Sequence, residues 1–410
     1  MEEILYKAIS ELQLDKSKWK LTKFGDVAIQ QKQSVDRENT ELTRYVQGGH
    51  MNSEDLHLRE WGELKDEYLG PAFIRRFDEG DILYGSRRTY LRKVVIASFS
   101  GITSNTTFVA KANEEKIDKR LLPFIMMSEG FTENSIKNSK GSVNPYINWK
   151  DIAKYEFLLP PKEQQAKLAK LLWAIDEEIE SVIGNINAID FLKRSTMKEL
   201  LTKGIGHTKF KKSSLGELPA SWEVGTLEDL CEEVFLGLTS KVDYVEEGGY
   251  PLVRTKDFSS GSLSFSKVKF ISEKQHNKLT KYRKTKKGDI LVSKSGSLGT
   301  CVIVDTEREF STYESVITIQ PKKEILYNIF LLQILSSFDI QKTMMEKQVG
   351  GVVGHLNLLS FRKNIVPVPP LEEQKSIAFK IEKIDHLNAA ALAKLSASKG
   401  LQKSLINQVF

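Results

Sequence analysis

Apolar residues recur at alternating spacings of four and three residues in two long stretches of the chain. This spacing places the side chains on one face of an α-helix and is typical of a coiled-coil seam. We therefore expect two helices of about 38 residues each that bury these faces against one another. The expected seam comprises Leu168, Leu172, Ile175, Ile179, Val182, Ile186 and Ile189, and, 209 residues later, Ile377, Ile381, Ile384, Asn388, Ala391, Leu395 and Ser398.

Asn388 is a polar residue on this seam, and we expect it to fix the alignment of the two helices at some cost in stability. The alternative interpretation is that each helix packs on its own globular domain. Each helix is expected to begin after a Pro-Pro pair, because proline ends a preceding strand and is tolerated in the first turn of a helix. These pairs are Pro160-Pro161 and Pro369-Pro370.

The same interval separates other matching segments. Residues 141–148 correspond to 350–357, and 160–165 correspond to 369–374, whereas 80–83 recur as 288–291 at an interval of 208. Two copies of one unit predict a pseudo-two-fold molecule. Because the first helix must end where the second domain begins, we expect the second helix to return antiparallel to it. The expected shape is a dumbbell with two globular ends on a helical rod.

The predicted fold class is α+β, with two strand-rich mixed α/β domains joined by two long antiparallel coiled-coil helices. Strands are expected at 94–97, 157–159, 290–292, 301–304 and 315–319, and helices at 121–127 and 327–345. A turn-rich loop, 295–299, should join two of the strands as a hairpin. The expected divisions are an N-terminal helix (1–18), a first domain (19–159), a central helix (160–205), a linker (206–221), a second domain (222–368) and a C-terminal helix (369–410).

Length and composition agree with two folded domains. The chain has 410 residues, of which 40% are hydrophobic and 9% aromatic, which suffices for two cores. Two cysteines, Cys231 and Cys301, cannot form a disulfide framework and fit a reducing compartment. The N-terminus lacks the pattern of a signal peptide, and no apolar run is long enough for a membrane span. We expect a soluble, cytoplasmic protein with no membrane partner.

The net charge of +6 is modest for this length, but the basic residues are clustered. Each copy has a basic cluster that could contact a phosphate backbone, although solvated faces of ordinary strands and loops remain an alternative for each. In the sequence, the second cluster is opposed only by Glu273. The first comprises Arg75, Arg76, Arg87, Arg88, Arg92 and Lys93, interleaved with Tyr84 and Tyr90; the second comprises Lys267, Lys269, Lys274, Lys278, Lys281, Arg283, Lys284, Lys286 and Lys287.

Catalytic and metal-binding motifs are not recognisable in the sequence. The chain has no phosphate-binding Gly-x-x-x-x-Gly-Lys-Ser/Thr motif, and Gly296 and Gly299 are interpreted as turn residues. Its six histidines do not pair with cysteines at the spacing of zinc ligands, so no metal site is predicted. No catalytic residue is predicted, and the pattern favours recognition over catalysis.

Several segments together resemble a known family. They are 80–92 (GDILYGSRRTYLR), 141–157 (GSVNPYINWKDIAKYEF), 160–165, 192–201 (LKRSTMKELL) and 204–224 (GIGHTKFKKSSLGELPASWEV). Over essentially its whole length the chain resembles the specificity subunit (HsdS) of type I restriction–modification systems. The resemblance implies two target recognition domains, each of which reads one half of a split DNA sequence, and two helices that set the spacing between the halves.

The resemblance also implies partners. Two modification (methyltransferase) subunits would dock on the helices, and two restriction (endonuclease/translocase) subunits would join that core. S-adenosylmethionine, ATP and Mg²⁺ would belong to these partners, and this chain would carry no cofactor and no catalytic activity. Two other classes remain open: a helical scaffold without nucleic-acid binding, and a self-contained DNA methyltransferase or nuclease.

The candidate DNA-binding residues are basic, hydroxyl, amide and aromatic side chains on expected loops, which can bind phosphates or read base edges. For Gly141 and Gly350, a required turn conformation is favoured over DNA contact. In the first domain the candidates are Arg87, Arg88, Tyr90, Lys137, Lys140, Ser142, Asn144 and Tyr146; in the second they are Arg254, Lys256, Lys281, Arg283, Lys284, Lys294, Ser295, Ser297, Gln348 and His355.

Overall fold

The computed structural model describes residues 14–36, 39–65, 68–246, 248–346 and 354–410. The chain forms two compact units, and each contains one end of each long helix. The first unit comprises Met1–Gly184 and Leu392–Phe410, and the second comprises Asn185–Ala391. No helix within the described ranges combines the length and the apolar character that a membrane span requires.

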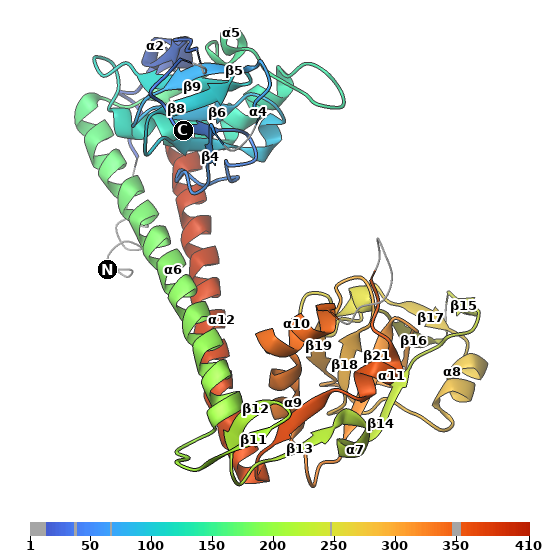
Figure 1. The fold of residues 1–410 in the computed structure, drawn as a ribbon. Coiled ribbons are helices and arrows are strands. Elements are labelled where there is room, and N and C mark those ends of the chain that lie inside the picture. The colour runs from blue at the N-terminus through green and yellow to red at the C-terminus, as the bar shows by residue number, and fades with distance from the viewer. Residues whose placement is uncertain (1–13, 37–38, 66–67, 247, 347–353) are drawn as a thin grey trace. The chain divides into compact units, whose positions relative to one another are not determined.

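The globular part of the first unit, which contains the labelled strands β4, β5, β6, β8 and β9 (Figure 1), is built on two four-stranded sheets. Their strand orders are β2-β9-β6-β7 and β4-β3-β8-β5. All pairings in these sheets are antiparallel except β3 with β8, and β1 and β10 form a separate antiparallel pair. The elements are β1 Lys20–Lys23, α2 Phe24–Val27, β2 Ala28–Gln31, β3 Arg44–Val46, β4 Gly62–Glu63, β5 Phe73–Phe77, β6 Ile82–Gly85, η1 Thr89–Leu91, β7 Val94–Ile96, β8 Gly101–Ser104, β9 Thr107–Ala112, η2 Lys119–Leu121, α3 Leu122–Met127, α4 Glu129–Lys137, α5 Trp149–Ile152 and β10 Glu156–Leu159.

The second unit repeats this plan with sheets β14-β21-β18-β19 and β15-β17-β16-β20, and β13 pairs with β22 as β1 pairs with β10. A further hairpin joins β11 to β12. The elements are β11 Phe210–Ser213, β12 Gly216–Pro219, β13 Glu223–Thr226, α7 Leu227–Leu230, β14 Cys231–Leu236, β15 Tyr244–Val245, β16 Tyr250–Val253, η3 Thr255–Asp257, β17 Lys269–Ile271, α8 Glu273–Thr280, β18 Ile290–Ser293, β19 Cys301–Ile303, β20 Ser311–Thr312, β21 Val316–Pro321, α9 Asn328–Leu335, α10 Phe338–Glu346, α11 Leu358–Arg362 and β22 Ile365–Val368.

The two long helices are α6 (Lys162–Lys203, 42 residues) and α12 (Leu371–Val409, 39 residues). They pack antiparallel, as predicted: in the first unit the start of α6 contacts the end of α12, and in the second the end of α6 contacts the start of α12 (Figure 1). The helix seams also join the domain cores, because Leu172 and Leu405 share a cluster with Phe124, and Leu201 and Ile381 share one with α9.

Polar contacts between the helices follow the antiparallel register. In the first unit, Gln402 Nε2 donates to Asp176 Oδ1 at 3.0 Å. In the second, Asn388 Nδ2 donates to Asp190 Oδ1 at 3.1 Å, and Lys193 forms an ion pair with Asp385. The predicted interhelical role of Asn388 therefore takes the form of a hydrogen bond to an acidic side chain. The middle seam positions are only half-buried: Ile186, Ile189, Ala391 and Leu395.

The glutamine of each Pro-Pro motif joins the start of its helix to the domain. The buried Gln165 donates to Pro160 O and accepts from the backbone N of Asp118. Gln374, 209 residues later, likewise donates to Pro369 O and accepts from the backbone N of Tyr327. The side-chain amide of each glutamine therefore pairs with one backbone carbonyl and one backbone N–H, which would otherwise lack a hydrogen-bond partner.

Most of the elements expected from the sequence are present, including the β18–β19 hairpin and helix α3. The helix expected at 327–345 is interrupted, because α9 ends at Leu335 and α10 begins at Phe338. The segment 206–221, expected as a linker, contains the β11–β12 hairpin. The expected N-terminal helix lies mainly outside the described residues, and 14–18 are not helical: 14–16 have no regular structure and 17–18 form a turn.

Candidate nucleic-acid interface

The turn after β6 and the loop after α4 meet through their backbones in the first unit. Arg87 and Lys140 each form an isolated antiparallel bridge with Tyr146. Ile147 N donates to Ser86 O at 2.9 Å, and Arg88 N donates to Pro145 O at 2.7 Å. We call residues 86–90 and 137–148 the first loop pair. These backbone hydrogen bonds hold two sequence-distant loops side by side, so the side chains of both loops lie on one surface.

The same arrangement recurs in the second unit. Ser295 bridges His355 as Arg87 bridges Tyr146, and Leu356 N donates to Lys294 O at 2.9 Å. Ser295 lies 208 residues after Arg87, and His355 lies 209 residues after Tyr146, so both follow the repeat intervals. We call residues 294–299 and 354–357 the second loop pair. The internal repeat thus includes the candidate interface, although the side chains at equivalent positions differ.

The recurring Gly-Asp-Ile-Leu segment shapes the turn that begins β6 and β18. Gly80 and Gly288 have φ of +85° and +91°, a conformation that favours glycine. The following carboxylates accept from the backbone, Asp81 from Asp78 N at 2.8 Å and Asp289 from Lys286 N at 2.7 Å. Burial raises the pKa of both carboxyl groups. These aspartates shape turns, and their hydrogen bonds explain why the segment recurs.

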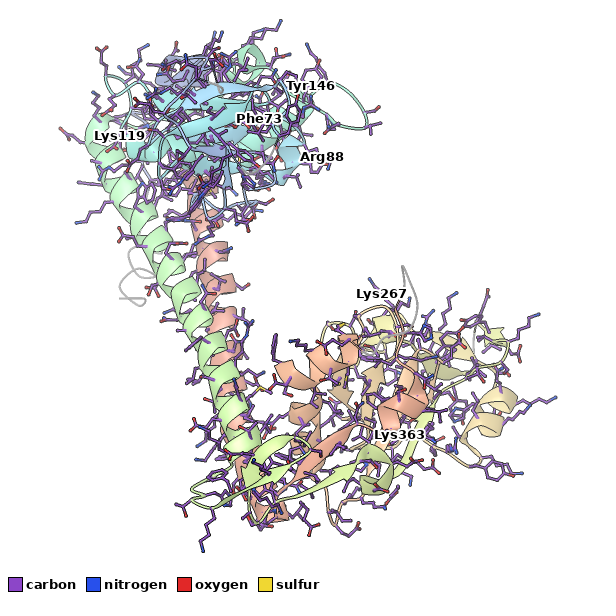
Figure 2. All side chains as sticks on the ribbon, viewed as in Figure 1. Phe73, Arg88, Lys119, Tyr146, Lys267 and Lys363 are labelled. Carbon is purple, nitrogen blue, oxygen red and sulfur yellow. The ribbon has the colours of Figure 1, made fainter. Side chains whose placement is uncertain are left out.

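The structure brings all the first-domain candidates to the first loop pair, and all are exposed. Figure 2 shows Arg88 and Tyr146 on the same side of the first unit. Arg88 has a left-handed backbone (φ +50°), and its Nε donates to Asn144 Oδ1 at 3.2 Å. Gly141 has φ of +86°, which supports the predicted turn role. The candidates are Arg87, Arg88, Tyr90, Lys137, Lys140, Ser142, Asn144 and Tyr146.

Several cations of the first basic cluster are already bound to groups within the protein. Arg76 pairs with Asp78, and Arg92 pairs with Glu54 and Glu129. Arg75 and Lys93 donate to backbone carbonyls. Within the part of the chain that the structure describes, no ion pair joins Arg87 or Arg88 to a carboxylate. The free cations of this cluster are therefore those of the first loop pair.

Tyr84 is interleaved with the first basic cluster in the sequence, but in the structure it is only 2% exposed and packs in the core. It lies on β6, where alternate side chains face opposite sides of the sheet and this strand is covered on both. Burial raises the pKa of its hydroxyl to about 12. Tyr84 is therefore a core residue.

In the second domain, Lys294 and Ser295 are half-buried, whereas Ser297 and His355 are exposed. Gln348 and Gly350 lie outside the described residues. Ser315 O accepts from both Lys294 N and Thr255 Oγ1, which places η3 beside the second loop pair. Lys256, on η3, is exposed.

Arg254 precedes η3 and differs from the exposed candidates. Its side chain is largely buried, and its Nε lies 3.5 Å from Asp257 Oδ2. Within the described residues, its Nε and Nη2 atoms are buried without a hydrogen-bond partner. Such donors are costly to bury, so Arg254 has unused hydrogen-bonding capacity beside η3.

The second basic cluster is partly neutralised by acidic residues that are distant in sequence. Arg283 Nε lies 3.3 Å from Glu233 Oε2, and Lys287 Nζ lies 3.4 Å from Glu307 Oε1. Lys284 pairs with Glu309. Glu273 is the only acidic residue within this cluster in the sequence, but folding also brings Glu233 of β14 and the 305–309 segment against it.

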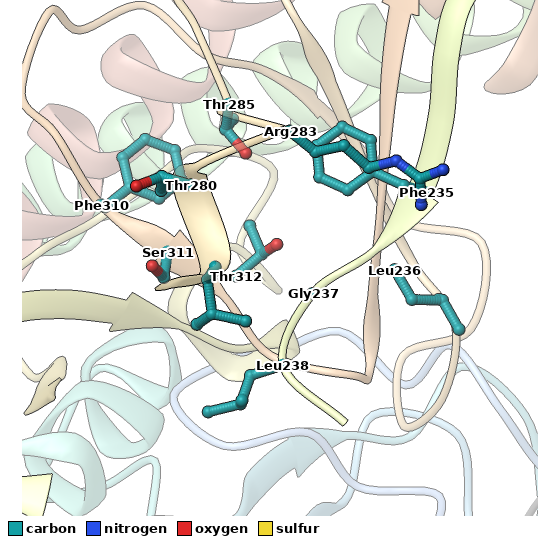
Figure 3. Close-up of a pocket in the computed structure, with 11 residues that line it drawn as sticks. Phe235, Leu236, Gly237, Leu238, Thr280, Arg283, Thr285, Phe310, Ser311 and Thr312 are labelled. Carbon is teal, nitrogen blue, oxygen red and sulfur yellow. The ribbon is translucent and has the colours of Figure 1, made fainter. Parts of the chain in front are cut away.

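A pocket of about 190 Å³ lies beside Arg283 in the second unit (Figure 3). The Arg283 guanidinium lies 6.0 Å from the ring centre of Phe235. Hydroxyl groups of Thr285 and Ser311 contribute polar lining, and Ser311 Oγ also contacts His276 Nδ1 at 2.9 Å. The pocket therefore combines an aromatic face with hydroxyl groups and one arginine side chain, which is paired with Glu233.

Sequence reasoning missed exposed residues beside the candidates. Val143 is exposed at the tip of the first loop pair, and Tyr282 is exposed between Lys281 and Arg283. The ring of Tyr282 lies 5.1 Å from Lys281 Nζ. The alternation of basic and aromatic residues in 281–283 is the signal that could have identified Tyr282.

Neither cysteine has the properties of a catalytic nucleophile. Both thiols are free, and burial raises the pKa of Cys231 and of Cys301 to about 12. They are therefore protonated at neutral pH, whereas the thiolate is the reactive form.

Comparison with known proteins gives consistent matches over both copies. The family model described as the type I restriction modification DNA specificity domain matches residues 16–190 and 219–397. The MjaVIII type I restriction enzyme specificity subunit of Methanocaldococcus jannaschii is 25% identical over 340 residues, which are 79% of each protein.

Solved structures share the fold. A chain from a study of complex assembly and conformational transition of the type I R-M system has a TM-score of 0.63 and 19% identity, with 97% of this chain and 98% of that chain covered. The type I restriction–modification S subunit from M. genitalium has a TM-score of 0.56 and 16% identity, with the same coverage of each.

Proposed function

The chain belongs to the type I restriction–modification DNA specificity family, since the family model covers both copies, and we propose that each globular domain reads one half of a bipartite DNA target. Its role is sequence-specific recognition of DNA within a type I restriction–modification complex. The relatives are named specificity subunits, so catalysis belongs to partner subunits.

The observation that carries the half-site assignment is the repeated loop pair. Both units place two sequence-distant loops together through equivalent backbone bridges, Arg87 with Tyr146 and Ser295 with His355. A common backbone with different side chains suits two binding surfaces that approach DNA in the same way and read different bases. Cationic side chains would set the register on the phosphates, while amide, hydroxyl and aromatic groups would contact base edges.

The proposed assembly contains two modification subunits and two restriction subunits. S-adenosylmethionine, ATP and Mg²⁺ would bind to those partners rather than to this chain. In the second unit, large apolar side chains on α6 and α12 are exposed, which supports a docking surface for a modification subunit. We call this set the helix patch; it comprises Phe191, Leu192, Phe379 and Leu387.

The test is to map the DNA motif of the reconstituted modification complex. Methylated adenines are located after methylation of a random DNA library by the wild-type complex and by variants of either loop pair. We expect a motif in two halves with a fixed gap, and variants of one loop pair should alter one half alone. A continuous motif, or changes in both halves from one loop pair, would refute the assignment.

A further inference from the structure

A cluster of charged residues joins the segment 54–59 to helix α6 in the first unit. The segment is held on β7, because Ile96 N donates to Leu56 O at 2.8 Å and His57 forms a parallel bridge with Ile96. Asp55 and His57 come from this segment and Glu180 comes from α6, and one potential ligand atom of each lies within 4.8 Å of the others. Glu180 follows Asp55 by 125 residues and His57 by 123, so sequence spacing gives no indication of the cluster.

The distances within the cluster fit donors around one small cation. His57 Nδ1 lies 3.5 Å from Asp55 Oδ1 and 3.4 Å from Glu180 Oε1. Zinc binds nitrogen and carboxylate oxygen at about 2.0–2.2 Å, so ligand atoms in a tetrahedral site lie roughly 3.3–3.6 Å apart. The imidazole nitrogen therefore lies at tetrahedral ligand spacing from each of the two carboxylate oxygens, and all three atoms lie within 4.8 Å of one another.

Asp176 places a buried carboxylate behind the ring of His57. Its side chain is 8% exposed, and its Oδ2 lies 3.6 Å from His57 Nε2, the ring nitrogen that faces away from Asp55 and Glu180. Oδ1 accepts from Gln402 at 3.0 Å, whereas Oδ2 is buried without a hydrogen-bond partner in the described structure. A metal-bound histidine usually donates its other N–H to such a carboxylate, which orients the ring.

The net negative charge of the cluster can balance a divalent cation. Three carboxylates, those of Asp55, Asp176 and Glu180, face Arg59 and His57, so with a neutral imidazole the negative charge exceeds the positive. Arg59 Nε donates to Asp55 Oδ2 at 2.7 Å, and its Nη2 donates to Glu180 Oε1. A cation bound to Asp55 Oδ1 and Glu180 Oε1 would displace Arg59 Nη2, which donates to both of these oxygens, and would leave the hydrogen bond from Arg59 Nε to Asp55 Oδ2 intact.

We propose that Asp55, His57 and Glu180 bind a divalent cation of the Zn²⁺ class, with Asp176 as the positioning residue for His57. An imidazole ligand and a small number of protein donors favour zinc over magnesium or calcium, which prefer all-oxygen sites. The ion ties segment 54–59 of the recognition domain to α6, and a solvent molecule completes its coordination.

The test is calorimetric titration of the tag-free, chelator-treated full chain with ZnCl₂. Wild type should bind one Zn²⁺, and His57→Ala and Glu180→Gln should each lower the affinity by more than about 100-fold, whereas Asp176→Asn should lower it about 10–100-fold. His386→Ala is the matched control, because His386 is an exposed histidine on α12 and should leave the affinity unchanged. Circular dichroism establishes that each variant is folded.

Arg59→Gln separates a metal site from a simple ion-pair network. Because Arg59 competes for Glu180 Oε1, its removal should raise the affinity of the full chain for Zn²⁺ if the metal site exists. Absence of stoichiometric Zn²⁺ binding by wild type and by Arg59→Gln would overturn the proposal. Binding that survives His57→Ala and Glu180→Gln together would overturn it as well.

Discussion

Arg87 and Arg88 differ from neighbouring basic residues in what their side chains contact. Arg76 and Arg92 are bound to carboxylates, and Arg75 donates to the backbone, so these cations are already engaged within the protein. The bridge between Arg87 and Tyr146 and the left-handed backbone of Arg88 instead hold both residues on an exposed turn. Exposed cations on a fixed backbone can bind phosphates with a small further loss of conformational entropy.

The first prediction compares two pairs of arginines. Arg87→Ala with Arg88→Ala should weaken DNA binding by the assembled complex about tenfold or more and reduce the salt slope of log K by about 1–2, since each phosphate contact contributes about 0.9. Arg75→Ala with Arg76→Ala removes the same formal charge from engaged positions and should have a smaller effect. Binding measured from low to high salt decides this, and equal effects of the two pairs would contradict the assignment.

A second residue-scale prediction concerns His276, which is buried against Ser311 and stacks on Tyr250 at 3.8 Å between ring centres. Burial lowers its pKa, and Lys284 opposes its charging, although Glu309 and Glu273 favour it. The folded state therefore binds this proton more weakly than the unfolded state, so stability should fall as pH decreases through the ordinary histidine pKa of about 6.5 toward the lower folded value.

The measurement is urea unfolding of the full chain at a series of pH values between 5 and 8. His276→Asn should flatten the part of the pH dependence that lies below about pH 6.5. His386→Asn is the control, because His386 is exposed and should leave the profile unchanged. An identical profile in wild type and His276→Asn would rule out this origin of the pH dependence.

At this scale the sequence predicts which residues occupy loops better than it predicts which charges are free. The first-domain candidates lie together because the GSVNPYIN turn is local and its glycine requires a positive φ. The partners of Arg283 and Lys287 could not be predicted, since Glu233 and Glu307 are brought to them by sheet pairing. A count of the basic residues in the sequence therefore overestimates the positive charge that is available to bind DNA.

Helices α6 and α12 show what periodicity can predict at the scale of elements. The spacing of four and three residues is a local signal, and it identified both the helices and their buried faces. Sheet order was not predicted, because pairings such as β3 with β8 join segments more than fifty residues apart. The interruption between α9 and α10 also escaped prediction, because Ser336 and Ser337 give only a weak break signal.

The third prediction separates the helix seam from the helix patch. Ile175 and Ile179 lie in the core of the first unit, so replacing both by Asp buries unpaired charge and should destabilise the chain by more than about 4 kcal/mol. Phe191 and Leu192 are exposed, and replacing both by Asp should change the free energy of unfolding by less than about 1 kcal/mol.

Assembly should respond differently in the two variants. The Phe191→Asp, Leu192→Asp variant should remain folded yet lose affinity for the modification subunit, because charge would enter the proposed docking surface. Denaturant unfolding measures stability, and co-purification with the modification subunit measures docking. A folded patch variant that still binds this subunit with unchanged affinity would remove α6 from the proposed docking surface.

At the scale of the whole molecule, the repeat governs both the recognition surfaces and the helices. Equivalent positions carry the Pro-Pro glutamines, the turn aspartates and the loop-pair bridges. The repeat departs from identity where side chains are exposed, as at Tyr146 and His355. Conserving the backbone while varying these side chains is what two different half-sites would require.

The last prediction tests whether the helix pair sets the distance between half-sites. At about 1.5 Å per residue, 42 and 39 residues correspond to roughly 63 and 58 Å, which exceeds the ~34 Å between half-sites one DNA turn apart. Inserting seven residues after Ile183 and seven after Leu392 keeps the heptad pattern and adds about 10.5 Å, or roughly three base pairs.

The double-insertion variant should therefore prefer the same half-sites with a longer gap, although DNA bending can absorb part of the change. Inserting seven residues in α6 alone is the matched control: it shifts contacts such as Asn388 with Asp190 by two helical turns and should impair folding or assembly. Selection of methylated or bound sequences from a library with random spacers measures the gap. An unchanged gap in a folded double-insertion complex would show that the helices do not set the spacing, and altered half-sites would show that they take part in reading bases.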